Sequence, residues 1–114
     1  MIYHVAKIEE WKASADRNDY YPFDYEREGF IHCSFSYQLE GVLERYYQDE
    51  KAVLILTIDE NTLISKVEAE LSELKNEIYP HIYGSINKDA IVHVEHELLS
   101  RGGGGLDHFF GTPG

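Results

Sequence analysis

The feature that most constrains the fold is a nearly unbroken apolar run at positions 52–58, which reads Ala-Val-Leu-Ile-Leu-Thr-Ile. Lys51 and Asp59 bound the run, and its length and β-branched content favour a strand over a helix. A run with no polar alternation predicts a strand that is buried on both faces, at the centre of a sheet. Because the chain has 114 residues and 43% of them are hydrophobic, one domain with one core is expected around this strand.

Two stretches have the period of an amphipathic helix. In the first, Ile8, Trp11 and Ala15 recur at i, i+3 and i+7, and the predicted helix ends near Asn18. In the second, apolar side chains recur at i, i+3, i+4, i+7 and i+8, and polar side chains take the opposite face. These apolar positions are Leu39, Val42, Leu43, Tyr46 and Tyr47.

Other stretches have the composition or the alternation of short strands. They are residues 2–5, 30–34, 67–71 and 90–95. Segment 78–84 contains Pro80, which cannot donate a hydrogen bond to a ladder, so this segment is predicted to be an edge strand or a structured loop. Residues 19–28 carry three tyrosines and a proline without a steady period, which predicts an ordered aromatic loop.

These elements together predict a mixed α+β domain, a small split β-sheet with two or three flanking helices. Residues 1–99 form this single α/β domain, and residues 100–114 form a glycine-rich C-terminal tail. No apolar run approaches the roughly 20 residues of a membrane-spanning helix, so no membrane partner is expected. The single cysteine, Cys33, cannot form an internal disulfide, which favours a reducing compartment and hence the cytoplasm.

The charge balance bears on the partners of the chain. Lys and Arg number 10 and Asp and Glu number 21, which gives a net charge of -11 with histidine neutral. This field repels phosphate backbones, so non-specific binding of nucleic acids is not expected. The net charge of the whole chain does not determine the charge inside a concave site, however. A small-molecule ligand of nucleotide type is therefore compatible with this acidic composition.

The polar residues of three predicted strands suggest a site. Successive side chains of a strand alternate between its faces, so each strand can present histidine, serine or tyrosine on one side. If the three polar faces converge, they line one pocket. Its residues would be His4, His32, Ser34, His81 and Tyr83.

Each of these residues also has a simpler interpretation. A buried histidine often serves only structure once its ring nitrogens are hydrogen-bonded. Ser34 is a suitable helix N-cap, and Tyr83 a suitable core aromatic residue. Glu68 and Glu70 belong by default to a solvated strand face, although either carboxylate could turn into the pocket.

Zinc binding and nucleophilic catalysis are two sharper alternatives for these residues. Three histidines can bind zinc, but the sequence has no HExxH motif and no cluster of Cys and His, so no metal ligands are assigned. Cys33 is a weak candidate nucleophile, because strand parity directs it away from His32.

Several motifs resemble a known family, the domain of unknown function 952 family. They are IYHV at 2–5, EEW at 9–11, EGFIHCS at 28–34, GVLERYY at 41–47, LILTID at 54–59 and YPHIYG at 79–84 followed by DAIVHV. The resemblance implies a fold like that of the ADP-ribosyltransferases, in which two small sheets frame a cleft.

The same resemblance implies roles for some of these residues. His4 would meet a ribose hydroxyl of NAD, and His32 with Ser34 would form the polar pair of the second strand. The late-strand glutamate of that superfamily is matched only by the candidates Glu68 and Glu70, or by His81 or Tyr83 in its place.

The leading hypothesis is a histidine-lined cleft that binds NAD or a related nucleotide. Its candidate catalytic residues are His4, His32 and His81, and its candidate ligand-binding residues are His4, His32, Ser34 and Tyr83. If the protein is an enzyme, it is expected to be an ADP-ribosyltransferase-like or 2′-phosphotransferase-like transferase that acts on a nucleotide-type substrate. A non-catalytic structural or protein-interaction module with structural histidines is the alternative, and a zinc-binding protein is the third option.

Overall fold

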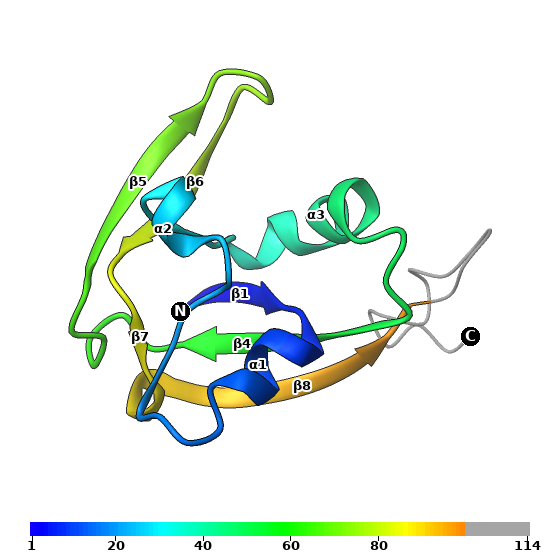
Figure 1. Cartoon of the computed structure of the whole chain (residues 1–114). Coiled ribbons are helices and arrows are strands. Elements are labelled where there is room, and N and C mark those ends of the chain that lie inside the picture. Colours follow the sequence, from blue (N-terminus) through cyan, green and yellow to red (C-terminus); the bar gives the residue numbers. More distant parts are fainter. Residues whose placement is uncertain (100–114) are drawn as a thin grey trace.

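The apolar run forms β4 (Ala52–Ile58) in the computed structural model, which describes residues 1–99 (Figure 1). It lies between β1 (Ile2–Ala6) and β8 (Ile91–Leu98), and it pairs antiparallel with both. Its side chains are buried on both faces of this sheet, from Val53 through Leu56. The prediction of a central strand is therefore confirmed. The tail predicted for residues 100–114 lies outside the described residues.

Each face of this sheet has its own apolar cluster. On one face, Leu54, Leu56 and Ile58 pack with the fully buried Tyr20 and with side chains of α1 (Ile8–Ala13). On the other face, Val53 and Ile55 pack against α3 (Leu39–Tyr46) through Leu39 and Leu43. The helices therefore cover opposite faces of one sheet, each because its apolar stripe needs a partner surface.

A second sheet has the order β3-β6-β5 and is also antiparallel. Its strands are β3 (Ile31–His32), β5 (Lys66–Ser72) and β6 (Glu77–Tyr83). β5 and β6 form a long hairpin that projects beyond the rest of the molecule (Figure 1). Ser34 joins this region to the first sheet, because its backbone exchanges two hydrogen bonds with Tyr3 at 2.7 and 2.9 Å. The chain is thus a mixed α+β protein with small antiparallel sheets and few helices, as predicted.

The prediction that segment 78–84 is an edge strand or a loop is wrong, because β6 is the middle strand of its sheet. Pro80 fits there because its backbone faces the side where β3 has already ended. Its carbonyl accepts a hydrogen bond from the Cys33 amide at 3.0 Å, and no ladder bond requires a donor from the proline nitrogen at that position.

The first helix ends at Ala13, earlier than the predicted Asn18, and Ala15 is exposed. The Ser14 hydroxyl donates to the Trp11 carbonyl at 2.7 Å, and the Lys88 amino group donates to the Ser14 carbonyl at 2.6 Å. Serine that bonds to nearby backbone in this way competes with the helical ladder, which explains the early end.

Residues 19–28 are more regular than the predicted loop. They contain β2 (Asp19–Tyr20), which pairs with β7 (Ile86–Asn87), and the short helix α2 (Tyr25–Glu28). Gly29 ends α2 with a left-handed φ of 84°, a conformation that glycine adopts without steric cost. None of the helices between residues 1 and 99 has the length and apolarity needed to cross a membrane.

Candidate functional site

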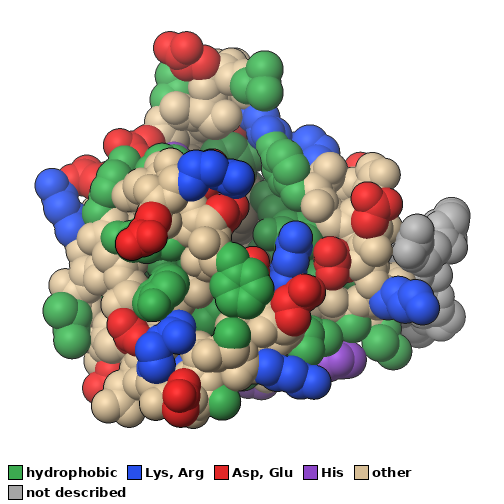
Figure 2. All heavy atoms as spheres, viewed as in Figure 1, with side chains coloured by type: hydrophobic (Ala, Val, Ile, Leu, Met, Phe, Trp, Pro, Cys, Tyr) green, Lys and Arg blue, Asp and Glu red, His purple; other side chains and the backbone are tan. Residues whose placement is uncertain are grey.

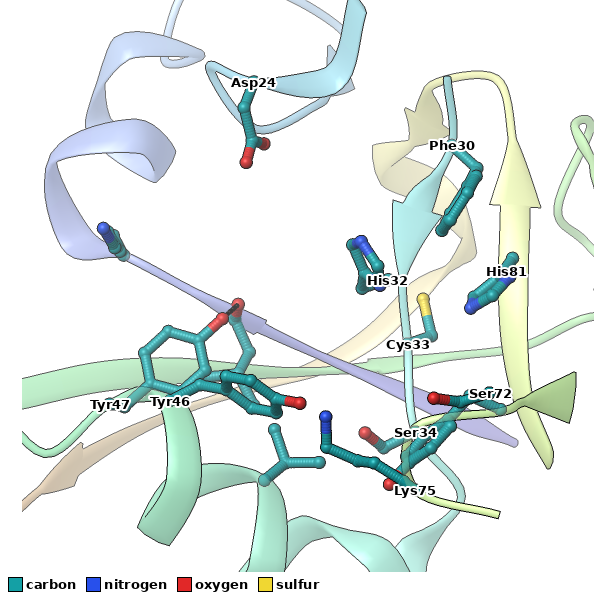
Figure 3. Close-up of a pocket in the computed structure, with 14 residues that line it drawn as sticks. Asp24, Phe30, His32, Cys33, Ser34, Tyr46, Tyr47, Ser72, Lys75 and His81 are labelled. Carbon is teal, nitrogen blue, oxygen red and sulfur yellow. Dashed lines mark hydrogen bonds between the residues drawn. The ribbon is translucent and has the colours of Figure 1, made fainter. Parts of the chain in front are cut away.

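A cavity of about 510 Å³ opens between the second sheet and α3, a volume in the range typical of small-molecule sites. Figure 2 shows the molecule hollowed between the sides that carry α2 and α3, with hydrophobic side chains inside and Lys or Arg side chains near the rim. Figure 3 shows the lining at close range. The cavity is lined by Val5, Lys7, Asp24, Phe30, His32, Cys33, Ser34, Val42, Tyr46, Tyr47, Ser72, Lys75, Tyr79 and His81.

Two of the predicted site histidines lie side by side in this lining. His32 of β3 and His81 of β6 are register partners across the two strands, and their ring centroids are 5.4 Å apart. The His32 side chain is 62% exposed and the His81 side chain is 11% exposed. Phe30 stacks on the His81 ring at 4.1 Å, which fixes the plane of that ring.

Each of these histidines is hydrogen-bonded to a carboxylate. His32 Nε2 lies 2.9 Å from Glu28 Oε1, and His81 Nδ1 lies 2.7 Å from Glu70 Oε1. The Tyr83 hydroxyl also donates to Glu70 Oε1, at 2.5 Å. These contacts orient both rings, and they leave Nε2 as the ring nitrogen through which His81 can act in the cavity.

The hydrogen bonds shift the titration of the carboxylates. The bond from Tyr83 and then the bond from His81 lower the pKa of Glu70, while the carboxylate raises the pKa of Tyr83. The bond to His32 lowers the pKa of Glu28 in the same way. Both carboxylates are therefore charged at neutral pH, and a charged carboxylate stabilises a protonated imidazole beside it.

His4 has a different environment from the other two histidines. Its side chain is buried among core residues, and its Nδ1 lies 2.7 Å from the carbonyl oxygen of His32. Since a carbonyl only accepts, Nδ1 carries the proton, and Nε2 can then accept from the Tyr20 hydroxyl at 3.4 Å. Burial lowers the pKa of His4 to about 4. His4 is thus a neutral residue behind the cavity and does not line it.

The other predicted residues are divided between the cavity and its surroundings. Ser34 is buried and lines the cavity, but the prediction that it caps a helix is wrong. The turn Ser36–Gln38 has Phe35 at its N-cap position, and the Gln38 side chain accepts from the Phe35 amide at 2.9 Å. Tyr83 is not among the residues that line the cavity, and its hydroxyl donates a hydrogen bond to Glu70.

The charge of the cavity differs from that of the whole chain. Lys7 and Lys75 contribute two amino groups and the histidines contribute two imidazoles, whereas the lining carboxylate among residues 1–99 is Asp24. The Lys75 amino group points into the cavity in Figure 3, and it lies 4.3 Å from the centre of the Tyr46 ring. Against a net charge of -11, this is a local site that favours an anion.

Several lining residues were not predicted from the sequence. Tyr46 is the last residue of α3 and Tyr47 is its C-cap, and their apolar spacing carries no signal that they line a cavity. The Tyr47 hydroxyl donates to the Val5 carbonyl at 3.3 Å, and burial raises the pKa of Tyr47 to about 12. Lys75 comes from the turn between β5 and β6, and only the folded hairpin places it at this site.

The geometry also bears on two other chemistries, nucleophilic catalysis by Cys33 and zinc binding. Cys33 lines the cavity, but burial raises the pKa of its thiol far above neutrality, so the thiol is protonated and a poor nucleophile. Across residues 1–99, no three side chains of His, Cys, Asp or Glu gather closely enough to hold a metal ion. The zinc hypothesis therefore has no ligand set in that part of the chain.

Comparison with known proteins gives a family model and a fold. The model described as "Protein of unknown function (DUF952)" matches residues 5–94. The crystal structure of protein CC0527 from Caulobacter crescentus superposes with a TM-score of 0.80 at 18% identity, over 96% of this chain and 97% of that chain. A double mutant of the same protein gives the same values. These structures share the fold, and no curated protein matches the chain.

Proposed function

The chain belongs to the DUF952 family, and from the chemistry of its cavity we propose that it binds a small anionic ligand of nucleotide type. The observation that carries the proposal is a pair of amino groups in an acidic protein: Lys7 and Lys75 line one cavity together with the imidazoles of His32 and His81. Such groups favour phosphate oxygens through charge-assisted hydrogen bonds.

The remaining lining suits the uncharged parts of a nucleotide. Phe30 and Tyr46 offer aromatic surface for a base, and the Ser34 and Ser72 hydroxyls can bond to ribose oxygens. His4 makes no ligand contact in this scheme, because both of its ring nitrogens are used inside the protein. Its proposed role is to hold the backbone of His32.

NAD is the first nucleotide that we propose to test, in keeping with an ADP-ribosyltransferase-like or 2′-phosphotransferase-like protein. The late-strand carboxylate of such a site would be Glu70, which lies on β5 and contacts His81. Glu68 is the weaker candidate, because it pairs with Lys66 at 2.7 Å. We propose a cytoplasmic location, since the cysteine is a free, buried thiol that a reducing compartment suits.

The test is a calorimetric and NMR titration with NAD, a nucleoside monophosphate and the matching uncharged nucleoside. We expect saturable binding of the two phosphorylated ligands, with shifts of the His32 and His81 ring signals. Lys75→Ala should weaken binding roughly tenfold or more, because a charge-assisted bond is lost. The exposed Lys12 lies outside the cavity, so Lys12→Ala should bind as the parent does.

Two results would contradict the proposal. One is equal binding of the nucleoside and the monophosphate, which would show that the cationic groups make no contact. The other is unmoved histidine signals throughout the titration of a folded protein, which would favour a non-catalytic interaction module.

A further inference from the structure

The paired histidines point to a reaction as well as to a ligand. Resting on the nucleotide site proposed above, we propose that His32 and His81 form an acid–base pair that hydrolyses a phosphodiester bond of the bound nucleotide. The class of substrate is a nucleoside monophosphate esterified through its phosphate to a second alcohol. The observation behind this inference is that two carboxylate-paired histidines line one cavity together with Lys7, Lys75 and Asp24.

The spacing of the two rings suits two proton transfers at one phosphate group. Their centroids are 5.4 Å apart and their planes are nearly perpendicular, at 77°. Strand pairing holds this spacing, because His32 and His81 face one another in the register of β3 and β6. A phosphate group bound against both rings would have one imidazole near the attacking oxygen and the other near the leaving oxygen.

The two histidines differ in ways that separate their roles. His81 is almost buried, is stacked on Phe30, and has Nδ1 bound to Glu70, so its free Nε2 is held in one direction. His32 is largely exposed beside Glu28, so it can exchange protons with solvent between turnovers. We therefore assign His81 as the base and His32 as the acid.

Water is the nucleophile in this scheme, because the Cys33 thiol is kept protonated by burial. The Nε2 lone pair of neutral His81 takes a proton from a water molecule as the water oxygen forms a bond to phosphorus. The bond from phosphorus to the leaving oxygen breaks, and protonated His32 gives its proton to that oxygen. The products are a phosphomonoester and an alcohol, and the two histidines then return to their starting states through solvent.

Other groups at the cavity support this step. Glu70 and Glu28 stabilise the imidazolium forms of their histidines, in the way that a carboxylate supports a catalytic histidine. Lys75 is directed into the cavity, where a cation stabilises charge that develops on the phosphoryl oxygens. Glu70 and Tyr83 are positioning residues, since the Tyr83 hydroxyl donates to Glu70 and its ring packs 5.5 Å from that of Phe30.

The test compares two esters of one nucleotide, the p-nitrophenyl ester and the methyl ester of thymidine 5′-monophosphate. p-Nitrophenolate leaves without a proton, whereas methoxide needs one. His32→Ala should therefore lose about 100-fold or more in kcat on the methyl ester and little on the p-nitrophenyl ester. His81→Ala should lose activity on both esters. His93 is an exposed histidine 3.5 Å from Glu95, so His93→Ala is the matched control and should retain both activities.

His81 is buried, so its replacement by alanine can unfold the protein, and Glu70→Gln provides a second measurement. The glutamine keeps the size of the side chain but does not stabilise an imidazolium, so kcat should fall while KM stays close to that of the parent. Equal losses on both esters for His32→Ala would overturn the proposal. Saturable nucleotide binding with no hydrolysis of either ester would overturn the acid–base pair and leave the binding site standing, whereas absence of binding would overturn both.

Discussion

The buried His4 makes the stability of this protein sensitive to mild acid. Burial lowers the pKa of His4 from 6.5 to about 4 in the folded protein, an effect larger than those of the nearby His32 and Asp24. In the unfolded chain this histidine becomes protonated as the pH falls through 6.5. Between these two values the unfolded state binds more protons, so the stabilisation is complete above pH 6.5 and is lost as the pH falls toward 4.

The size of the effect follows from the two pKa values. The gap between 6.5 and about 4, at about 1.4 kcal/mol for each pH unit, corresponds to about 3 kcal/mol of unfolding free energy. At pH 5 about three fifths of the interval between 6.5 and about 4 has been crossed, so a loss of about 2 kcal/mol is expected. Small domains have only about 5–15 kcal/mol of stability in total, so the loss is readily measured.

The assay is urea unfolding at pH 7, 6 and 5, followed by the fluorescence of Trp11. This residue is the single tryptophan of the chain, and it packs at 5.5 Å from the Tyr20 ring in the same core region. His4→Gln removes the titrating group. The advantage of the parent over this variant should shrink by about 2 kcal/mol between pH 7 and pH 5.

His96→Gln is the control, because His96 is an exposed residue on β8 and its replacement should leave the pH dependence unchanged. The reasoning would be refuted if the parent and His4→Gln lost stability in parallel between pH 7 and pH 5. NMR signals of His4 that titrate near pH 6.5 in the folded protein would refute it as well.

Three further predictions concern stability and reactivity. Cys33 is buried and its pKa is raised, so the native protein should resist a thiol reagent such as dithionitrobenzoate and should react only at the rate at which it unfolds. Gly84→Ala should lower the thermal stability by about 1–3 kcal/mol, because φ is 145° and a Cβ would overlap the Ser65 hydroxyl, while Gly29→Ala, with open space around it, should cost less. Gln38→Ala should cost about 1–3 kcal/mol in urea unfolding, because the buried amide bonds to Phe35 and Ile78, while the exposed Gln48→Ala should be close to neutral.

The elements that could be predicted from the sequence are those whose secondary structure is determined by the pattern of their own side chains. The uniform run of β4 and the apolar stripe of α3 both carry their signal locally, and both were predicted correctly. β6 could not be placed in the same way. Whether a strand with Pro80 can lie inside a sheet depends on where its neighbour β3 ends, and that is a property of the fold.

The site was predictable to a similar degree. Strand parity suggested that His32 and His81 could face one side, and the structure brings these two rings together. The alternation of side chains along the strand did not show whether His4 would point into the core or into the cavity. Its neighbours on that face, Ile2 and Ala6, are core residues, so His4 points into the core as they do. Lys75 and Tyr46 meet at the cavity only because a hairpin turn approaches α3 in the folded chain.

The hydrogen bond from His4 to the His32 carbonyl also bears on how ligand preference could change in laboratory evolution. The His4 ring is buried in the core and bonds to the backbone of His32, whose own ring lines the cavity. A substitution that changes the volume beside Tyr20 would move His4, and His4 would carry that movement to the backbone of His32. Selection for a new ligand should therefore enrich substitutions behind the cavity, such as at Trp11, together with those that line it.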